Sequence, residues 1–118
     1  MSKVSIIAKV DFILEMISNI EKIVKRHNGI IKALDDYEGK MAIMMGLLQI
    51  GESLNRIDKE YLEKYDLIED TKGAYNVRNF IAHDYDGVNM TVVEDIIRIY
   101  LPRLKEKVLE IQIEFRDD

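Results

Sequence analysis

The segment 78–85, Arg-Asn-Phe-Ile-Ala-His-Asp-Tyr, holds the residue types of this sequence best suited to chemistry on a phosphodiester. A histidine titrates near neutral pH and can move a proton, as His83 could here. An arginine such as Arg78 offers a planar fork of donors to phosphate oxygens and stabilises charge that develops there. Because an RNA strand carries its own nucleophile, the 2′-hydroxyl, these two side chains could cleave RNA without a metal ion.

The spacing within this segment predicts how its side chains share a helix. Arg78 and His83 lie about 140° apart around a helix axis, so they do not share a face. Asn79 and His83 are four residues apart and can touch or point at a common ligand. Tyr85 is expected to be exposed in the turn that follows. On spacing alone, the plainer interpretation is favoured, in which Arg78 forms a surface ion pair and His83 ends a helix.

Composition and charge limit the class of protein. The 118 residues fit one domain, 1–118, and the absence of cysteine excludes a disulfide framework and a thiolate metal site. The formal net charge of −5 argues against generic nucleic-acid binding but not against a local Arg/His site. No signal peptide or membrane span is indicated, so a cytoplasmic protein without a membrane partner is expected.

Apolar residues recur at helical spacing through most of the chain, which predicts an all-α fold. Asn28-Gly29 provides a stop signal for the first helix. Its stripe is formed by Ile6, Val10, Ile13, Ile17, Ile20 and Val24.

The middle of the chain is expected to carry three further helical segments. One covers about 37–57, and its Gly46 and Gly51 either let another helix approach closely or are a tolerated cost. Residues 58–65 form either a short helix or a continuation of the one before, and they precede the helix that carries segment 78–85. That helix is expected to open at Asp70 or Thr71 and to end near Asp86-Gly87.

The last third is expected to form one interrupted helix. Thr91 and Glu94 match a capping box that would start it, and Pro102 should kink or divide it. The final residues, 114–118, are expected to fray. Four or five helices joined by short connections predict an up-and-down bundle.

Arg78-Asn79-x-x-x-His83 on a late helix resembles the signature of the HEPN superfamily, and Arg78-x4-His83-x-Tyr85 resembles its HepT toxin branch. The segment 48–54, Leu-Gln-Ile-Gly-Glu-Ser-Leu, resembles an Ile-Gly-Glu stretch of that branch, and 84–104 resembles its C-terminal third. The resemblance covers roughly residues 41–108. Residues 67–72 depart from it, because the family often has proline and tryptophan there.

This resemblance implies a HEPN-like helical bundle that pairs as a two-fold homodimer, with Arg78 and His83 of both protomers lining a cleft. It implies a metal-independent ribonuclease toxin that acts on RNA, with no cofactor and no DNA substrate. It also implies a minimal nucleotidyltransferase as antitoxin, which transfers AMP from ATP to Tyr85. Asn79 would orient Arg78 or His83, and Glu52 and Asp84 are candidates for supporting roles.

Other interpretations of the same residues stay open. Glu52 could pair with Arg78 or Asn79, either to orient them or as a purely structural ion pair. Tyr85 could be a half-buried anchor for the C-terminal helix. The whole chain could be a non-catalytic module that binds a nucleotide or the nucleotidyltransferase, or a structural dimer with a coincidental motif. His27 is most simply a helix-end cation, and no His/carboxylate spacing suggests zinc.

Overall fold

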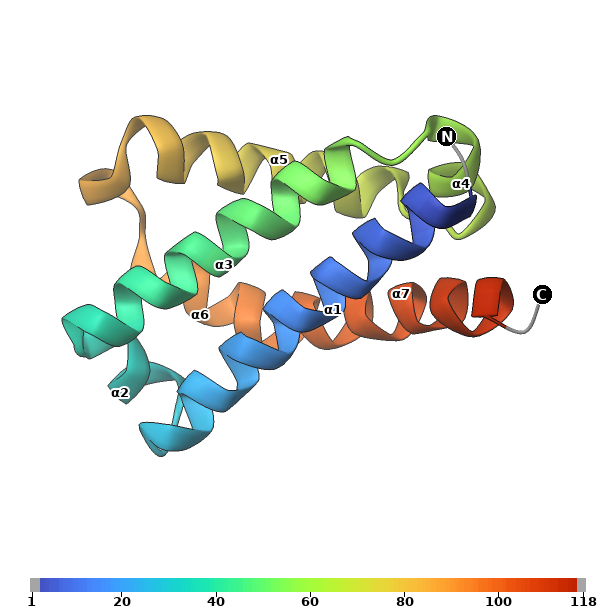
Figure 1. Cartoon of the computed structure of the whole chain (residues 1–118). Helices are drawn as coiled ribbons and strands as arrows, with labels where there is room; N and C mark the ends of the chain where they lie inside the picture. Colours follow the sequence, from blue (N-terminus) through green and yellow to red (C-terminus); the bar gives the residue numbers. More distant parts are fainter. Residues whose placement is uncertain (1–2, 117–118) are drawn as a thin grey trace.

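The computed structural model describes residues 3–116, and in this part of the chain every regular element is helical (Figure 1). This confirms the all-α prediction. Four long helices alternate with short ones and with two short non-α turns. The elements are α1 (Lys3–Arg26), α2 (Ile30–Asp35), α3 (Tyr37–Asn55), α4 (Lys59–Lys64), α5 (Ile68–His83), the 3-10 turn η1 (Tyr85–Gly87), α6 (Met90–Asp95), the π-helix η2 (Ile96–Tyr100) and α7 (Leu101–Arg116).

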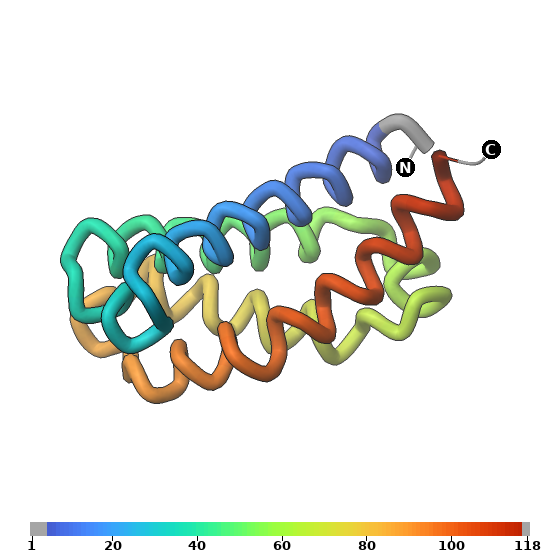
Figure 2. Tube along the Cα trace, turned by 90° about the horizontal axis from the view of Figure 1, so that it is seen from below, coloured from blue at the N-terminus to red at the C-terminus, as the bar shows by residue number. Residues whose placement is uncertain are grey.

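The four long helices run up and down, as the short connections predict. α1 lies between α3 and α7, and α3 lies between α1 and α5 (Figures 1 and 2). α5 packs mainly on α3 and hardly touches α7. An open apolar groove of about 390 Å³ therefore remains between α5 and the α6–α7 segment, with Gly73, Val77 and Tyr100 among its lining residues.

The apolar stripe of α1 forms the centre of the core. Ile6, Val10, Ile13, Ile17 and Ile20 are each at most 1% exposed, which confirms the stripe predicted from their spacing. The buried residues of the other long helices pack around it; they include Ile43, Met44, Leu47, Ile50, Leu54, Leu104, Val108 and Ile111.

Two glycines of α3 allow its close contacts on both sides. A Cβ at Gly46 would lie 3.0 Å from Cδ1 of Ile20 on α1. A Cβ at Gly51 would lie 2.6 Å from the carbonyl oxygen of Ala74 and 2.8 Å from Cβ of Arg78, both on α5. The close-approach interpretation of these glycines is confirmed, and Gly51 makes the contact that brings α3 against the middle of α5.

The start of the C-terminal helix differs from the prediction. The capping residue is Asn89, whose Oδ1 accepts from the backbone N–H of Thr91 at 2.8 Å, so the expected Thr91/Glu94 capping box is wrong. Asn89 lies two residues before Thr91, so it caps the first free amides, including that of Thr91 itself. Glu94 instead pairs with Arg98 four residues later, at 3.0 Å.

Pro102 divides the C-terminal helix as predicted. The π-helix η2 ends two residues before it, and regular α7 resumes at Leu101. Proline removes one backbone donor and crowds the preceding turn, and a locally widened turn accommodates both effects.

The expected fraying at 114–118 is wrong for the described part, because α7 continues to Arg116, and residues 117–118 lie outside the description. Glu114 holds this end of α7 against α4. It pairs with Lys64 at 2.8 Å and accepts a hydrogen bond from the Tyr65 hydroxyl. The Lys64 ammonium and this hydrogen bond lower the pKa of Glu114, whereas burial and the same bond raise the pKa of Tyr65 to about 12. Within residues 3–116, no helix is long and apolar enough to cross a membrane.

Candidate active site

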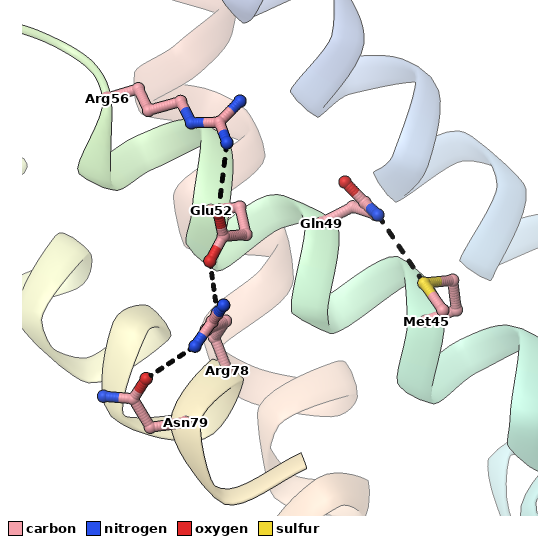
Figure 3. A network of polar contacts seen from close by, with 6 residues as sticks. All are labelled: Met45, Gln49, Glu52, Arg56, Arg78 and Asn79. Carbon is pink, nitrogen blue, oxygen red and sulfur yellow. Dashed lines mark hydrogen bonds and ion pairs between the residues drawn. The ribbon is translucent and has the colours of Figure 1, made fainter. Parts of the chain in front are cut away.

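Arg78 lies at the α3–α5 contact, where Glu52 and Asn79 hold its guanidinium (Figure 3) and Tyr75 lies beside it. Its Nε pairs with Oε1 of Glu52 on α3, and its Nη1 donates to Oδ1 of Asn79 at 3.0 Å. Its guanidinium also lies 5.6 Å from the ring centroid of Tyr75, one turn earlier on α5. The side chain is 26% exposed, so the guanidinium is fixed and still reaches the surface.

Glu52 receives a second arginine. Its Oε2 lies 3.4 Å from Nη2 of Arg56, four residues later on α3. Glu52 is 22% exposed and Arg56 is 70% exposed, so Arg78 is the inner partner and Arg56 the outer one (Figure 3). Of the two partners considered for Glu52, Arg78 and Asn79, the structure pairs it with Arg78. The sequence analysis missed Arg56 and Tyr75, although spacings of four and three residues along a helix could have indicated them.

The adjacent residues Gly51 and Glu52 perform two linked tasks. Gly51 lets the α3 backbone approach Ala74 and Arg78, and Glu52 then meets the Arg78 side chain without reaching far. A short, partly desolvated ion pair of this kind fixes an arginine more firmly than an exposed pair does.

His83 is the last residue of α5 and is exposed. Within residues 3–116 no ion pair or hydrogen bond holds its imidazole. Asn79 directs its amide oxygen to Arg78 rather than to His83, although the two residues share a face of the helix. The structure therefore joins Arg78, Asn79 and Glu52 into one cluster and leaves His83 outside it.

α5 ends at His83 and not near Asp86-Gly87 as expected. The backbone N–H of Asp84 closes the helix on the carbonyl of Phe80 at 2.8 Å, and the Asp84 backbone then leaves helical geometry at φ −149°. The Asp84 carboxylate lies over Gly87, where an added Cβ would meet its Oδ2 at 2.1 Å. Asp84 thus shapes the turn η1.

Tyr85 begins the 3-10 turn η1 and is half-buried. Its hydroxyl oxygen is buried and has no hydrogen-bond partner among the described residues, so the prediction of an exposed tyrosine is wrong for the hydroxyl group. Nζ of Lys40, in the second turn of α3, lies 5.6 Å from the ring centroid. The sequence analysis missed Lys40, since no local spacing connects positions 40 and 85.

The second histidine is structural. His27 Nδ1 lies 2.8 Å from the carbonyl of Ile23, and its Nε2 lies 3.3 Å from Oδ2 of Asp36. The same Oδ2 caps α3 by accepting from the backbone N–H of Gly39 at 2.8 Å. This backbone bond, with a smaller contribution from His27, lowers the pKa of Asp36. No cluster of three or more metal-binding side chains occurs among residues 3–116.

Comparison with known proteins places these residues in a family. The profile of the family described as "Ribonuclease HepT-like" matches residues 13–111, which include Glu52, Arg78, His83 and Tyr85. No solved structure gives a significant match.

Three named relatives agree with that family. Putative RNase MJ0127 of Methanocaldococcus jannaschii is 25% identical over 102 residues, which are 85% of this chain and 84% of that protein. Putative RNase TTE0752 of Caldanaerobacter subterraneus subsp. tengcongensis is 31% identical over 70 residues, 59% of this chain and 62% of that protein. Gamma-glutamylcyclotransferase and putative RNase MJ0434, also of M. jannaschii, is 28% identical over 106 residues, and this chain spans only 45% of it. Since the family profile covers most of the chain, the protein belongs to the HepT-like ribonucleases of the HEPN superfamily.

Proposed function

We propose that this protein is a metal-independent endoribonuclease toxin whose active site forms at the interface of a two-fold homodimer. Arg78 binds and polarises the phosphate, His83 exchanges protons, and Asn79 orients Arg78. The observation that carries the proposal is the contrast within the motif. Arg78 is fixed by Glu52, Asn79 and Tyr75, whereas His83 is exposed and held by no described contact.

The reaction needs only these groups and the RNA. The 2′-hydroxyl attacks the adjacent phosphorus and loses its proton to a base. The 5′-oxygen leaves with a proton supplied by an acid, giving a 2′,3′-cyclic phosphate and a 5′-hydroxyl. An imidazole can exchange protons near neutral pH, and the guanidinium of Arg78 stabilises the charge that builds on the phosphate oxygens. Across a dimer axis, His83 of one protomer would act beside Arg78 of the other, first accepting the proton of the 2′-hydroxyl and then giving it to the 5′-oxygen, so that each dimer has two composite sites.

Exposed apolar side chains beside the cluster support a dimer face there. Tyr37, Met41 and Met45 repeat every four residues on α3 and are 72%, 57% and 54% exposed. This stripe continues along α3 toward Gln49, which donates to the sulfur of Met45, and toward Glu52 (Figure 3). Burial of such a stripe against a second copy would be favourable, and it would bring the two Arg78 clusters close to one another.

We propose further that a partner nucleotidyltransferase silences the toxin by modifying Tyr85. The phenolic oxygen would attack the α-phosphorus of ATP, its proton would pass to a base, and pyrophosphate would leave. The added phosphate would place negative charge and bulk beside His83. Since the hydroxyl is buried in this structure, the turn η1 must open before the transfer.

Mixed dimers test the composite site. We expect Arg78→Ala and His83→Ala to lower RNA cleavage by a factor of about 100 or more each, because each removes a group that acts in the transition state. Unfolding and refolding the two inactive variants together should restore about a quarter of the original activity. About half of the dimers are then mixed, and each has one complete site, with Arg78 from one protomer and His83 from the other.

The control is either variant refolded alone, which should stay inactive. Activity that survives both substitutions would exclude this catalytic assignment and favour a non-catalytic module that binds a nucleotide or the nucleotidyltransferase. Loss of activity without recovery in the mixture would place Arg78 and His83 in one protomer's own site.

A further inference from the structure

Lysine and arginine side chains that form ion pairs with carboxylates lie in a different part of the chain from most of those that do not. Within residues 5–116, seven make no ion pair with a described carboxylate, and five of these lie between positions 22 and 40. They are Lys22, Lys25, Arg26, Lys32 and Lys40; the other two are Arg103 and Lys9, which donates to Ser5. The nine paired cations all lie outside positions 22–40, at Arg56, Lys59, Lys64, Lys72, Arg78, Arg98, Lys105, Lys107 and Arg116.

The carboxylates of the same segment do not neutralise these cations. Residues 22–40 contain five Lys or Arg and three Asp or Glu, a net charge of +2, whereas the whole chain carries −5. Asp36 is engaged by His27 and by the amide that it caps. Asp35 and Glu38 remain exposed on α2 and α3. The five cations, named here the basic corner, are therefore a local positive region on an acidic protein.

The basic corner lies at one end of the bundle. α1 ends there, α2 packs between α1 and α3, and α3 begins (Figures 1 and 2). The end of α5 with the turn η1 reaches the same end (Figure 1). Lys22, Lys25, Arg26 and Lys32 are exposed, so their ammonium and guanidinium groups are free to meet a large ligand.

Lys40 connects the basic corner to the candidate active site. Its Nζ lies over the ring of Tyr85, two residues from His83. Lys40 is half-buried, and the described residues offer its ammonium group no contact other than that ring. A polyanion bound at His83 that extends past Tyr85 would thus meet Lys40 first and then the cations of α2 and α1.

We propose that the basic corner binds the phosphates of the RNA strand that flank the cleaved bond. The proposal rests on the ribonuclease function proposed above and names a substrate-binding surface for it. RNA is favoured over an acidic protein as the ligand because the cations do not form a separate patch. Lys40, over the ring of Tyr85, links the other four to the turn η1 that follows His83. Such contacts hold the sugar–phosphate backbone and do not read its bases. They would let an acidic protein hold a long RNA while its remaining surface repels it.

A pair of charge-matched variants tests this surface in the non-cleaving His83→Ala background. The first carries Lys25→Gln, Arg26→Gln and Lys32→Gln. The control carries Lys59→Gln, Lys64→Gln and Arg116→Gln, which lie on α4 and the end of α7, at the opposite end of the bundle (Figure 1). Both sets lower the net charge equally, and all six residues are exposed.

The measurement is the affinity for a labelled single-stranded RNA of about 20 nucleotides as a function of salt. We expect the first set to weaken binding at least about 10-fold and to reduce the slope of log K against log salt by about 2, because each lost phosphate contact on a single strand contributes about 0.7. The control set should change affinity by less than about 3-fold, as expected for distant charges screened by salt.

A second readout separates this proposal from the function on which it rests. In the cleaving protein, the first set should raise KM for the long RNA and leave cleavage of a dinucleotide unchanged, since a dinucleotide is too short to reach α1. Lys22→Gln with Lys32→Gln avoids the last turn of α1 and should give an intermediate loss of affinity. Three outcomes would overturn the proposal that the basic corner binds RNA. They are equal weakening of RNA binding by both triple variants, no weakening by either, and no RNA binding by the parent protein. Loss of the catalytic assignment alone would leave the affinity result intact.

Discussion

The middle of α5 carries Arg78, whose side chain is held by its neighbours, and the end of α5 carries His83, whose side chain is exposed and not held. In the middle, Gly51 brings α3 into contact, and Glu52, Asn79 and Tyr75 hold Arg78. At the end, His83 is exposed without a described contact, and the Tyr85 hydroxyl two residues later has no hydrogen-bond partner among residues 3–116. In the mechanism proposed above, the protomer would preorganise its phosphate-binding group by itself, and the second protomer or the substrate would place its proton-transfer group.

Removal of the Glu52 carboxylate, which holds Arg78, should give the largest effect on RNA cleavage. Glu52 contacts Nε of Arg78, and no described contact engages Nη2. In the proposed mechanism, Glu52 would therefore position the guanidinium and leave Nη2 for a phosphate. We expect Glu52→Gln to lower kcat about 10-fold or more with little change in KM, because an unanchored arginine stabilises the transition state less well. Single-turnover cleavage of a short RNA measures this effect.

Arg56→Gln is the matched control, since it removes the outer, 70% exposed partner of the same carboxylate. It should leave kcat within about 2-fold, as exposed ion pairs contribute little. A rise in activity for Glu52→Gln would reverse the argument and make Glu52 a competitor of the substrate phosphate.

The sequence contains much of this arrangement, because helical periodicity and short motifs are local. The stripe Ile6–Val10–Ile13 predicts α1. The sequence offers a close approach as one of two interpretations of Gly51, and Arg78 as one of two partners for Glu52, and the structure shows both. The orientation of Tyr85 could not be predicted in the same way. It depends on the packing of η1 beside Lys40, forty-five positions away, which only the folded chain brings together.

Errors at helix ends have a different physical origin. Asn89 and Thr91 are both able to cap a helix, and their sequence preferences differ by only a few tenths of a kcal/mol, about the scale of one tertiary contact. Local rules therefore predicted that a helix starts in this region and could not choose between the two residues. The short helix α2 was missed for a similar reason, since the Asn28-Gly29 stop before it gives no sign of a new start.

A glycine-to-alanine substitution can be made on either side of α5. Gly51, on α3, faces the close α3–α5 contact, and Gly73, on α5 itself, faces the open groove. A Cβ at Gly51 meets Ala74 and Arg78 at 2.6 and 2.8 Å, whereas a Cβ at Gly73 meets nothing within 4 Å. We expect Gly51→Ala to destabilise the fold by about 1–3 kcal/mol, as overpacking does, and to displace Arg78 and lower activity. Gly73→Ala should stabilise it by about 0.5–1 kcal/mol through higher helix propensity, with activity retained.

Urea unfolding of both glycine variants measures these free energies. Equal and small changes for the two would mean that α3 and α5 separate without cost, and Arg78 would then not be held by the contact. A large loss for Gly73→Ala would contradict the open groove beside α5.

Removal of the Tyr85 hydroxyl should give the smallest effect, and it tests whether the turn after α5 holds this group without a hydrogen bond. Tyr85→Phe removes a buried polar atom that lacks a hydrogen bond and keeps the ring beneath Lys40, so we expect the free energy of unfolding to rise by up to about 1 kcal/mol. Tyr65→Phe is the control of opposite sign: it deletes a hydroxyl that donates to Glu114 and should lower stability by about 0.5–1.5 kcal/mol. Intact mass after coexpression with the partner nucleotidyltransferase gives a second readout, in which the gain of AMP expected for the parent protein should vanish in Tyr85→Phe. If Tyr85→Phe loses stability as Tyr65→Phe does, the Tyr85 hydroxyl is already hydrogen-bonded within the fold. The end of α5 would then be held by polar contacts as its middle is.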